Sequence, residues 1–203
     1  MYPLVRLAKE FWSHRKALPL GLFDTHVSHH RCWPHDIDVW MELNNGRTLT
    51  LYDLGRFVLF RRVKAISLMR SHGWGGTVAG SSVRYRRRLR MFDRFEMRTR
   101  IIGWDRRFIY IEQAMWRDGE CTSHVLIRTA ITDRNGLVPM ERVIEALAPG
   151  TLSPPLPAWV EAWSAAEAER PWPPMQPAPA GTPDPGDRGA ADRSGGPGGP
   201  GGA

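Results

Sequence analysis

The chain has 203 residues, of which 42% are hydrophobic, and it carries a formal charge of +7. This length suits one domain with extensions, and the apolar content is sufficient for a buried core, which excludes a wholly disordered chain. The charge is uneven, because residues 151–203 carry three arginines against six acidic residues, a net −3, which leaves +10 on residues 1–150. The positive charge of residues 1–150 favours anionic partners: nucleic acid, anionic lipid or a phosphate-bearing small molecule.

The chain has only two cysteines, Cys32 and Cys121. Two cysteines in a chain of this size do not make a disulfide framework, and no Cys/His spacing typical of a metal site surrounds them. We therefore expect a reduced, cytoplasmic protein with no metal ligands. No run of about 18 apolar residues is present, so we expect no transmembrane segment. Residues 1–16 lack the apolar core and cleavage site of a signal peptide.

Residues 1–20 form an N-terminal extension with apolar side chains at helical spacing. These are Leu4, Leu7, Ala8, Phe11 and Trp12. The spacing predicts a short amphipathic helix that packs on the domain, with contact to a membrane surface as the alternative.

Residues 26–35 look extended and contain His26, His29, His30 and His35, which we expect at the surface or at a dimer contact. The stretch DIDVWMELNNGR (36–47) follows. Residues 48–73 contain no proline and are apolar on most of the helical circumference, which predicts one long helix buried in the middle of a domain. Gly73 is a suitable helix stop.

The next 60 residues have the alternation and turn signals of antiparallel strands. The predicted strands cover residues 77–89, 94–104, 107–117 and 121–133. A turn at 91–93 and the pair Asp118-Gly119 separate them, and a short helix at 139–147 follows. One helix followed by an antiparallel sheet is an α+β layout.

The last segment, residues 149–203, differs in composition from the rest. Nine prolines and nine glycines lie among the 33 residues from Pro171 onward. Such a segment cannot bury enough apolar surface to offset its ordering entropy, so we expect most of it to be disordered. Residues 157–169 are compatible with a short helix.

Asp36 and Asp38 have two possible roles from the local sequence. Aspartate and asparagine are preferred at helix starts and turns, so both carboxylates could simply shape the turn before the long helix. Alternatively, a carboxylate beside a helix N-terminus could act as base or nucleophile on a carbonyl that the unpaired amides polarise.

The order of elements around this stretch resembles the 4-hydroxybenzoyl-CoA thioesterase family of the hotdog superfamily, in its diverged thioesterase-like branch. That family has an aspartate, five intervening residues and two asparagines. They precede a helix with an acidic residue, two spacers and an arginine. Asp38, the pair Asn44 and Asn45, and the run 53–56 (Asp-Leu-Gly-Arg) match this pattern, and the resemblance covers about residues 26–147.

The resemblance implies a hotdog domain over residues 21–148, with an antiparallel sheet wrapped around one long central helix. It implies hydrolysis of acyl-CoA thioesters by a homodimer or homotetramer, without a metal or redox cofactor. Asp38 would be the nucleophile or general base, and the helix start at Asn45 and Gly46 would hold the oxyanion. Asp36 and Asn44 would support the turn and contact substrate.

The sequence departs from the family immediately before the asparagines. The family has adjacent glycine and histidine residues, separated from the two asparagines by one residue. This chain has Met41 and Glu42 at these two positions. This departure motivates an alternative function, a non-catalytic protein that binds acyl groups or acyl-CoA.

The run RYRRRLR (84–90), read as a strand, would send four arginines to one side. It could be a solvated face, a site for coenzyme A phosphates, or a surface for nucleic acid. No nucleic-acid-reading motif accompanies it, so we expect no nucleic-acid partner. The predicted substrate contacts here are Ser82, Arg84, Arg86 and Arg88.

Overall fold

The computed structural model describes residues 2–175 of the chain. The chain divides into two units, described separately here: residues 1–158, and residues 159–203. In the described part of the second unit, the regular structure is the rest of helix α5 (Ala158–Glu169), where a short helix was expected. Most of the predicted disordered tail lies outside the described residues.

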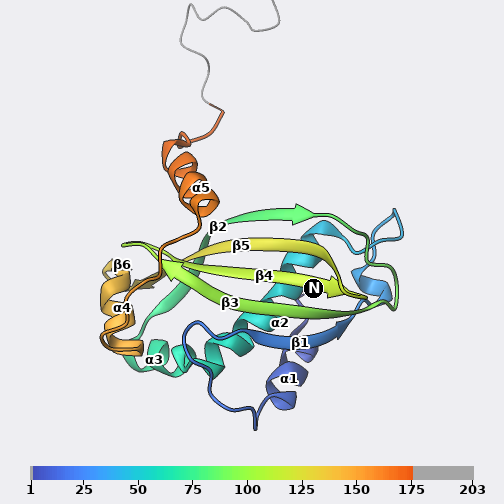
Figure 1. The fold of residues 1–203 in the computed structure, drawn as a ribbon, viewed down its shortest axis with the longest axis horizontal. Coiled ribbons are helices and arrows are strands. Elements are labelled where there is room, and N and C mark those ends of the chain that lie inside the picture. Colours follow the sequence, from blue (N-terminus) through green and yellow to red (C-terminus); the bar gives the residue numbers. More distant parts are fainter. Residues whose placement is uncertain (1, 176–203) are drawn as a thin grey trace, which may run out of the picture. The chain divides into compact units, whose positions relative to one another are not determined.

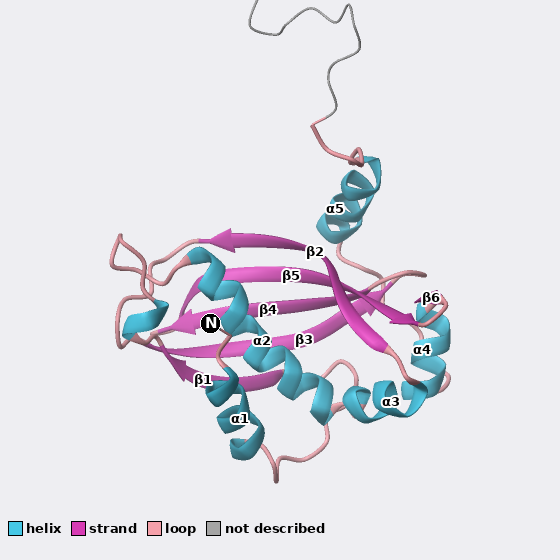
Figure 2. Ribbon diagram, turned by 180° about the vertical axis from the view of Figure 1, so that it is seen from behind, coloured by secondary structure: helices cyan, strands magenta, loops and turns pink. Residues whose placement is uncertain are grey.

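The first unit is a curled antiparallel sheet with helix α2 lying across one face (Figures 1 and 2). Its strand order is β1-β3-β4-β5-β2, and β6 pairs with β5 in line with β4. This is the predicted α+β layout of a sheet around a central helix. In chain order, its elements are α1 (Leu4–Ser13), β1 (His26–Arg31), the 3-10 helix η1 (Pro34–Asp36), α2 (Asn45–Arg62), α3 (Ala65–His72), β2 (Gly75–Tyr85), β3 (Arg94–Trp104), β4 (Ile109–Arg117), β5 (Glu120–Asp133), β6 (Gly136–Val138) and α4 (Met140–Leu147).

The predicted single helix over residues 48–73 is in fact two helices. α2 begins earlier, at Asn45, and ends at Arg62, and α3 starts after a break at Lys64, whose φ is +65°. A left-handed residue cannot continue a helix, so the chain changes direction there. Gly73, also left-handed, ends α3 as predicted.

α2 packs its apolar stripe into the sheet. Leu51, Leu54, Val58 and Leu59 are fully buried, at the spacing expected of one helix face. Gly55 allows the close approach. A Cβ added there would lie 2.7 Å from both the Met97 sulfur and the Thr99 hydroxyl of β3.

A buried polar group lies between α2 and the sheet. Arg56 donates to the Gln113 side-chain oxygen at 3.2 Å and pairs with Asp53, three residues before it. The Gln113 amide donates to the Tyr52 carbonyl at 2.8 Å and to the Thr99 hydroxyl at 3.0 Å. The acidic residue and the arginine of the 53–56 run therefore form one pair that links the helix to the sheet.

β2 is shorter at its end than predicted. It stops at Tyr85, and the amides of Arg86 and Arg87 both donate to the Thr122 carbonyl, which breaks the strand alternation. Residues 86–93 form a loop. The prediction that Arg86, Arg88 and Arg90 share one strand face with Arg84 was therefore wrong.

The other strands lie close to their predicted positions. β3 has the predicted bounds, and β4 and β5 differ by two residues and one residue at their starts. Asp118 and Gly119 have φ values of +51° and +81°, the two left-handed positions of a tight hairpin turn. The short strand β6 was not predicted. Residues 149–157 also pack on this unit, where the Ser153 hydroxyl accepts from the Trp104 amide at 2.9 Å.

α1 packs against α2 and β1. Arg61 of α2 donates to the Phe11 carbonyl at 2.8 Å. Glu10 is buried, and its carboxylate lies 3.8 Å from His30 Nδ1 on β1. His26 and His30 are themselves buried, so the prediction of surface or dimer-contact histidines was wrong for these two. Burial, together with nearby cations, lowers the pKa of each to about 3.

Candidate functional site

Asp38 lies in a small hairpin, residues 37–43, that precedes α2. Its carboxylate accepts from the Trp40 amide at 2.8 Å, and its own amide donates to the Glu42 carbonyl at 2.9 Å. Met41 closes the turn with a φ of +59°. The left-handed backbone conformation is favourable for glycine and costly for methionine. This explains why the resembled family has glycine at this position. The turn is thus retained without the glycine.

α2 starts immediately after this hairpin. Asn44 is the N-cap, and its side-chain oxygen accepts from the Arg47 amide at 3.0 Å. The amides of Asn45 and Gly46 have no hydrogen-bond partner among residues 2–175. Both residues are exposed. The first turn therefore presents two donors at the positive end of the helix dipole, suited to an oxyanion.

A cavity of about 150 Å³ lies beside this helix start. Its lining includes Glu42, Asn45, Thr48, Tyr85, Arg86 and Arg88. The Tyr85 hydroxyl donates to the Asn45 carbonyl at 3.0 Å, which joins the end of β2 to the start of α2. The structure thus brings Arg86 and Arg88 to the helix start, although as loop residues. Tyr85 and Thr48 were not among the predicted site residues, because neither belongs to the motif that pointed to the site.

The Glu42 carboxylate in this cavity is paired with an arginine. Its carboxylate oxygen lies 2.7 Å from the Arg88 guanidinium. Glu42 occupies the position of the family's histidine, and an arginine from a loop more than 40 residues later neutralises it.

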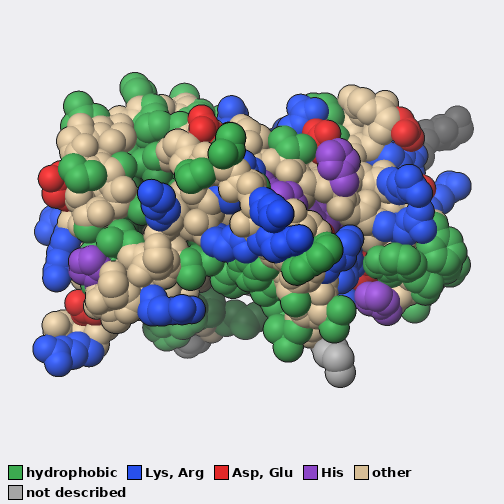
Figure 3. Space-filling view, turned by 90° about the horizontal axis from the view of Figure 1, so that it is seen from below, with side chains coloured by type: hydrophobic (Ala, Val, Ile, Leu, Met, Phe, Trp, Pro, Cys, Tyr) green, Lys and Arg blue, Asp and Glu red, His purple; other side chains and the backbone are tan. Residues whose placement is uncertain are grey.

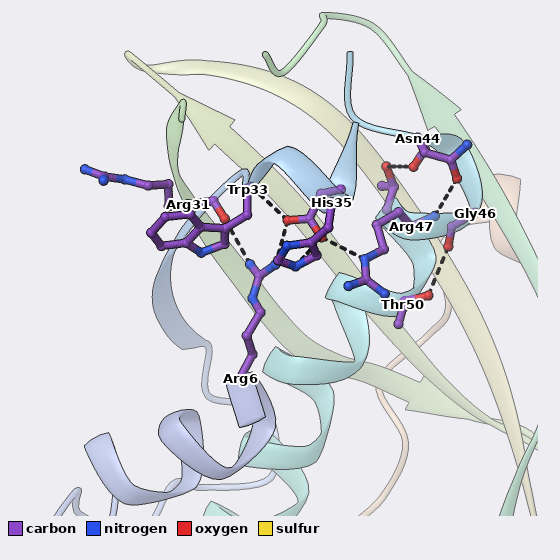
Figure 4. Close-up of polar contacts among 10 residues, drawn as sticks. Arg6, Arg31, Trp33, His35, Asn44, Gly46, Arg47 and Thr50 are labelled. Carbon is purple, nitrogen blue, oxygen red and sulfur yellow. Dashed lines mark hydrogen bonds and ion pairs between the residues drawn. The ribbon is translucent and has the colours of Figure 1, made fainter. Parts of the chain in front are cut away.

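Asp36, expected to assist and to contact substrate, has a structural position instead. It is fully buried, and each oxygen lies 2.7 Å from an arginine: Oδ1 from Arg47 Nε of α2, and Oδ2 from Arg6 Nη1 of α1. Figure 4 shows Arg6 and Arg47 reaching this point from opposite sides. The Trp33 amide also donates to Oδ2, at 2.9 Å. Burial alone would raise the pKa of Asp36, but the hydrogen bonds from Arg47, Trp33 and Arg6 outweigh it, so the pKa is lowered.

Ser82 and Arg84 lie away from the cavity. Val83 of β2 packs into the core cluster that contains α2 residues, so its neighbours on the strand point to the opposite face of the sheet. Within one chain, the structure therefore does not bring Ser82 and Arg84 to the start of α2.

A second cavity, apolar and about 370 Å³ in volume, opens where β2 begins. Phe57 and Phe60 of α2, Met69 of α3, and Trp74 line it, and so does Gly76 of β2. A Cβ at Gly76 would lie 3.1 Å from the Met69 methyl group, so the glycine keeps this space open.

Residues 2–175 contain neither a metal-ligand cluster nor a membrane-spanning helix. No three histidine, cysteine, aspartate or glutamate side chains in this range come together as a metal-ligand group. No helix in the same range is long and apolar enough to span a bilayer.

The sequence model of the thioesterase-like superfamily matches residues 32–164, well over half of the chain. The chain belongs to the thioesterase-like superfamily. The match covers the hairpin, α2 and the whole of the sheet from β2 onward.

Curated relatives are similar over part of their length. Protein THEM6 of Xenopus laevis is 42% identical over 80 residues, which are 39% of each chain. Protein THEM6 of Drosophila melanogaster is 31% identical over 117 residues, 56% of this chain and 61% of the relative. The chain therefore spans between two fifths and three fifths of the curated relatives it matches.

Solved structures share the fold. YbaW, a probable thioesterase from Escherichia coli, superposes with a TM-score of 0.55 at 16% identity, over 60% of this chain and 97% of its own. A thioesterase from Thermus thermophilus, in complex with coenzyme A and zinc, has a TM-score of 0.51 at 21% identity, over 65% of this chain and 99% of its own. The hotdog fold predicted from the sequence is thus confirmed.

Proposed function

We propose that this protein hydrolyses acyl-CoA thioesters to the free acid and coenzyme A. The observation that carries the proposal is the pair of unpartnered amides of Asn45 and Gly46, directly after the Asp38 hairpin and beside an arginine-lined cavity. Membership of the thioesterase-like superfamily supports the same reaction.

Asp38 is the carboxylate assigned to the chemistry. It is half-buried and forms no ion pair within residues 2–175, whereas Asp36 is clamped by two arginines and Glu42 by one. Asp38 attacks the thioester carbonyl or activates a water molecule. The amides of Asn45 and Gly46 then stabilise the negative charge on the carbonyl oxygen.

The two ends of the substrate need different surroundings. Arg86 and Arg88 line the cavity next to the helix start and suit the phosphates of coenzyme A, a molecule that the Thermus thermophilus neighbour binds. The apolar cavity of about 370 Å³ suits the acyl group. The reaction so drawn uses no metal or redox cofactor.

A second copy of the chain would bring these two places together. The outer edge of β2 has no strand partner among residues 2–175. Antiparallel pairing of two β2 edges, centred on Gly80, places Gly75 of one copy opposite Tyr85 of the other. The apolar cavity of one copy then lies next to the α2 start of its partner, so we assign the working enzyme a homodimer, alone or within a tetramer.

Thiol release from a panel of short, long and aromatic acyl-CoAs tests the proposal. We expect turnover by the natural protein and its loss in Asp38→Asn, with an unchanged far-UV circular dichroism spectrum. Equal rates for the two proteins would remove Asp38 from the chemistry.

The alternative is a protein that binds acyl groups or acyl-CoA without hydrolysing them. The departure at Met41 and Glu42 favours it, because the position of the family's histidine holds a glutamate that is paired with Arg88. Calorimetry that finds tight acyl-CoA binding, together with no thiol release from any acyl-CoA of the panel, would select this alternative.

A further inference from the structure

Exposed hydrophobic side chains gather at the end of the sheet that carries the Asp38 hairpin. Figure 3 shows a cluster of hydrophobic side chains at the right-hand end of the molecule, where η1 and the loops 37–43 and 86–93 lie in Figure 1. Between 40% and 89% of each side chain concerned is exposed. We call this set the apolar rim: Trp33, Val39, Trp40, Met41 and Phe92.

The two loops that carry the rim are fastened to each other. The Leu43 amide at the base of the hairpin donates to the Leu89 carbonyl at 2.8 Å, and both leucines are buried. The Phe92 amide donates to the Cys32 carbonyl at 2.7 Å, and the Phe92 ring packs edge-on against Trp33 at 6.2 Å between centroids. The rim is therefore a fixed surface on a hydrogen-bonded base.

Folding stability does not explain two of the rim residues. Met41 and Phe92 have φ values of +59° and +67°. Bulky side chains rarely adopt this conformation, because the Cβ atom is then too close to the backbone. Both side chains are also more than half exposed, so neither offsets this strain through burial. An apolar side chain kept at an exposed and strained position indicates a contact outside the folded chain.

Positive charge surrounds the rim. Residues 84–94 contain six arginines and one aspartate. Two of the six are paired with acidic residues outside this run, Arg87 with Glu120 and Arg88 with Glu42. Arg90 and Arg94 in this run are exposed, and the Arg31 guanidinium lies 5.6 Å from the Trp33 ring centroid. Exposed tryptophan next to arginine is the combination that suits the boundary between water and a bilayer with anionic headgroups.

We propose that the apolar rim docks this protein onto a bilayer that carries anionic lipids. Val39, Trp40 and Met41 enter the headgroup region, and Arg90 and Arg94 face the lipid phosphates. The dipole-bearing start of α2 and its cavity then lie near the surface in which acyl chains dissolve. The docking is independent of the proposed hydrolysis and is tested without any thioester.

Sedimentation with unilamellar vesicles measures this docking. We compare vesicles of phosphatidylcholine with vesicles of phosphatidylcholine mixed with phosphatidylglycerol, and expect binding to the second. Trp40→Ser, and separately the double variant M41G/F92G, should bind about tenfold more weakly. The glycine variants relieve strain, so they fold at least as well as the natural chain, and their loss of binding cannot be attributed to unfolding.

A double arginine variant tests whether vesicle binding depends on positive charge beside the rim. Arg90→Gln combined with Arg94→Gln should weaken binding to the mixed vesicles about 25-fold, at about fivefold for each arginine near an anionic surface. Trp12→Ser is the matched control, because Trp12 is also exposed but lies on α1, outside the rim. It should bind like the natural protein.

Three results would overturn the proposal. One is the absence of binding to either kind of vesicle. Another is an equal loss of binding in Trp12→Ser and Trp40→Ser. The third is a change of sedimentation coefficient, rather than of vesicle binding, when the rim is altered, since the rim would then be a contact between copies of this chain.

Discussion

Asp36 Oδ1 lies 2.7 Å from Arg47 Nε, and this contact joins the segment before the hairpin to the first turn of α2. Arg6 of α1 completes the group on the other oxygen. All three side chains are largely removed from water, with exposed fractions of 0% for Asp36 and 15% for each arginine. Two arginines, one 30 residues before Asp36 and one 11 residues after it, therefore meet at one carboxylate.

Asp36→Asn should destabilise the fold, whereas Asp38→Asn should not. Removing the Asp36 charge leaves two nearly buried guanidinium groups without their counter-ion, which costs about 3 kcal/mol. Asparagine at Asp38 still accepts from the Trp40 amide, so the change there stays below about 1 kcal/mol. Urea unfolding of both variants checks this. Similar midpoints would show that the Asp36 group does not stabilise the fold.

Acidification should destabilise the fold through His26 and His30. Both have a folded pKa of about 3, because they are buried among cations, and an unfolded pKa of about 6.5. Below pH 6.5 the unfolded state binds more protons, so stability is complete above 6.5 and falls as the pH is lowered toward 3. Each histidine contributes a loss of about 2 kcal/mol between pH 7 and pH 5.

Unfolding free energies at pH 7 and pH 5 measure this loss. Glu10 opposes it in part, because burial raises its pKa and the folded state takes up a proton there. His30→Gln should reduce the pH dependence, and His29→Gln, at an exposed site, should retain it. Stability that does not change between pH 7 and pH 5 would contradict the assignment.

Gly55→Ala should destabilise, although the same change in most helices stabilises. An alanine methyl group in a helix interior gains about 1 kcal/mol over glycine. At Gly55 that methyl group would lie 2.7 Å from Met97 and Thr99, which forces the helix away from the sheet at a cost of about 1–3 kcal/mol. Gly46→Ala is the control, because its nearest contact would be an ordinary 3.4 Å. A gain in melting temperature for Gly55→Ala would show that α2 can move.

Met41→Gly should raise the stability. Glycine removes the strain of a methionine in the left-handed conformation, but it also raises the backbone entropy of the unfolded chain. The net gain in the free energy of unfolding is about 0.5–1 kcal/mol. Val39→Gly, at a neighbouring position without a positive φ, should lose stability instead. Thermal unfolding of both variants measures the difference, and a loss in both would show that Met41 is not strained.

Val78→Lys should separate the two copies of the proposed dimer. Val78 is half exposed on β2, whose outer edge has no strand partner in the described part of the chain, and a lysine on such an edge opposes pairing with another strand. Val27→Lys, on the edge strand β1, is the control and should leave the assembly unchanged. Sedimentation equilibrium checks both. A Val78→Lys protein of unchanged mass would move the proposed interface away from β2.

The sequence predicted the elements whose signal is local. β3 alternates polar and apolar residues, and Asp118-Gly119 is a turn pair, so both were placed correctly. The helix break at Lys64 could not be predicted, because its cause is a backbone conformation and not a residue type typical of helix ends. The early end of β2 was also missed, because its arginines continue the alternating pattern after the strand has stopped.

The sequence indicated the motif residues of the candidate site, but not the residues that form ion pairs with them. Asp38, Asn44 and Asn45 are close in sequence, and their spacing carries the information. Besides the nearby Arg47, Asp36 pairs with Arg6, and Glu42 pairs with Arg88. No local pattern predicts contacts between residues as far apart as 6 and 36, or 42 and 88. For this reason Asp36 was expected to face substrate and is found buried.

The hydrogen bond from the Tyr85 hydroxyl to the Asn45 carbonyl joins the last residue of β2 to the first residue of α2. The edge strand β2 and the start of α2 are thus connected directly by this hydrogen bond. In the proposed dimer, a partner strand that shifted β2 would therefore also shift the amides of Asn45 and Gly46. The proposed pairing of two β2 strands would thus act on the helix start of each copy through a hydrogen bond inside that copy.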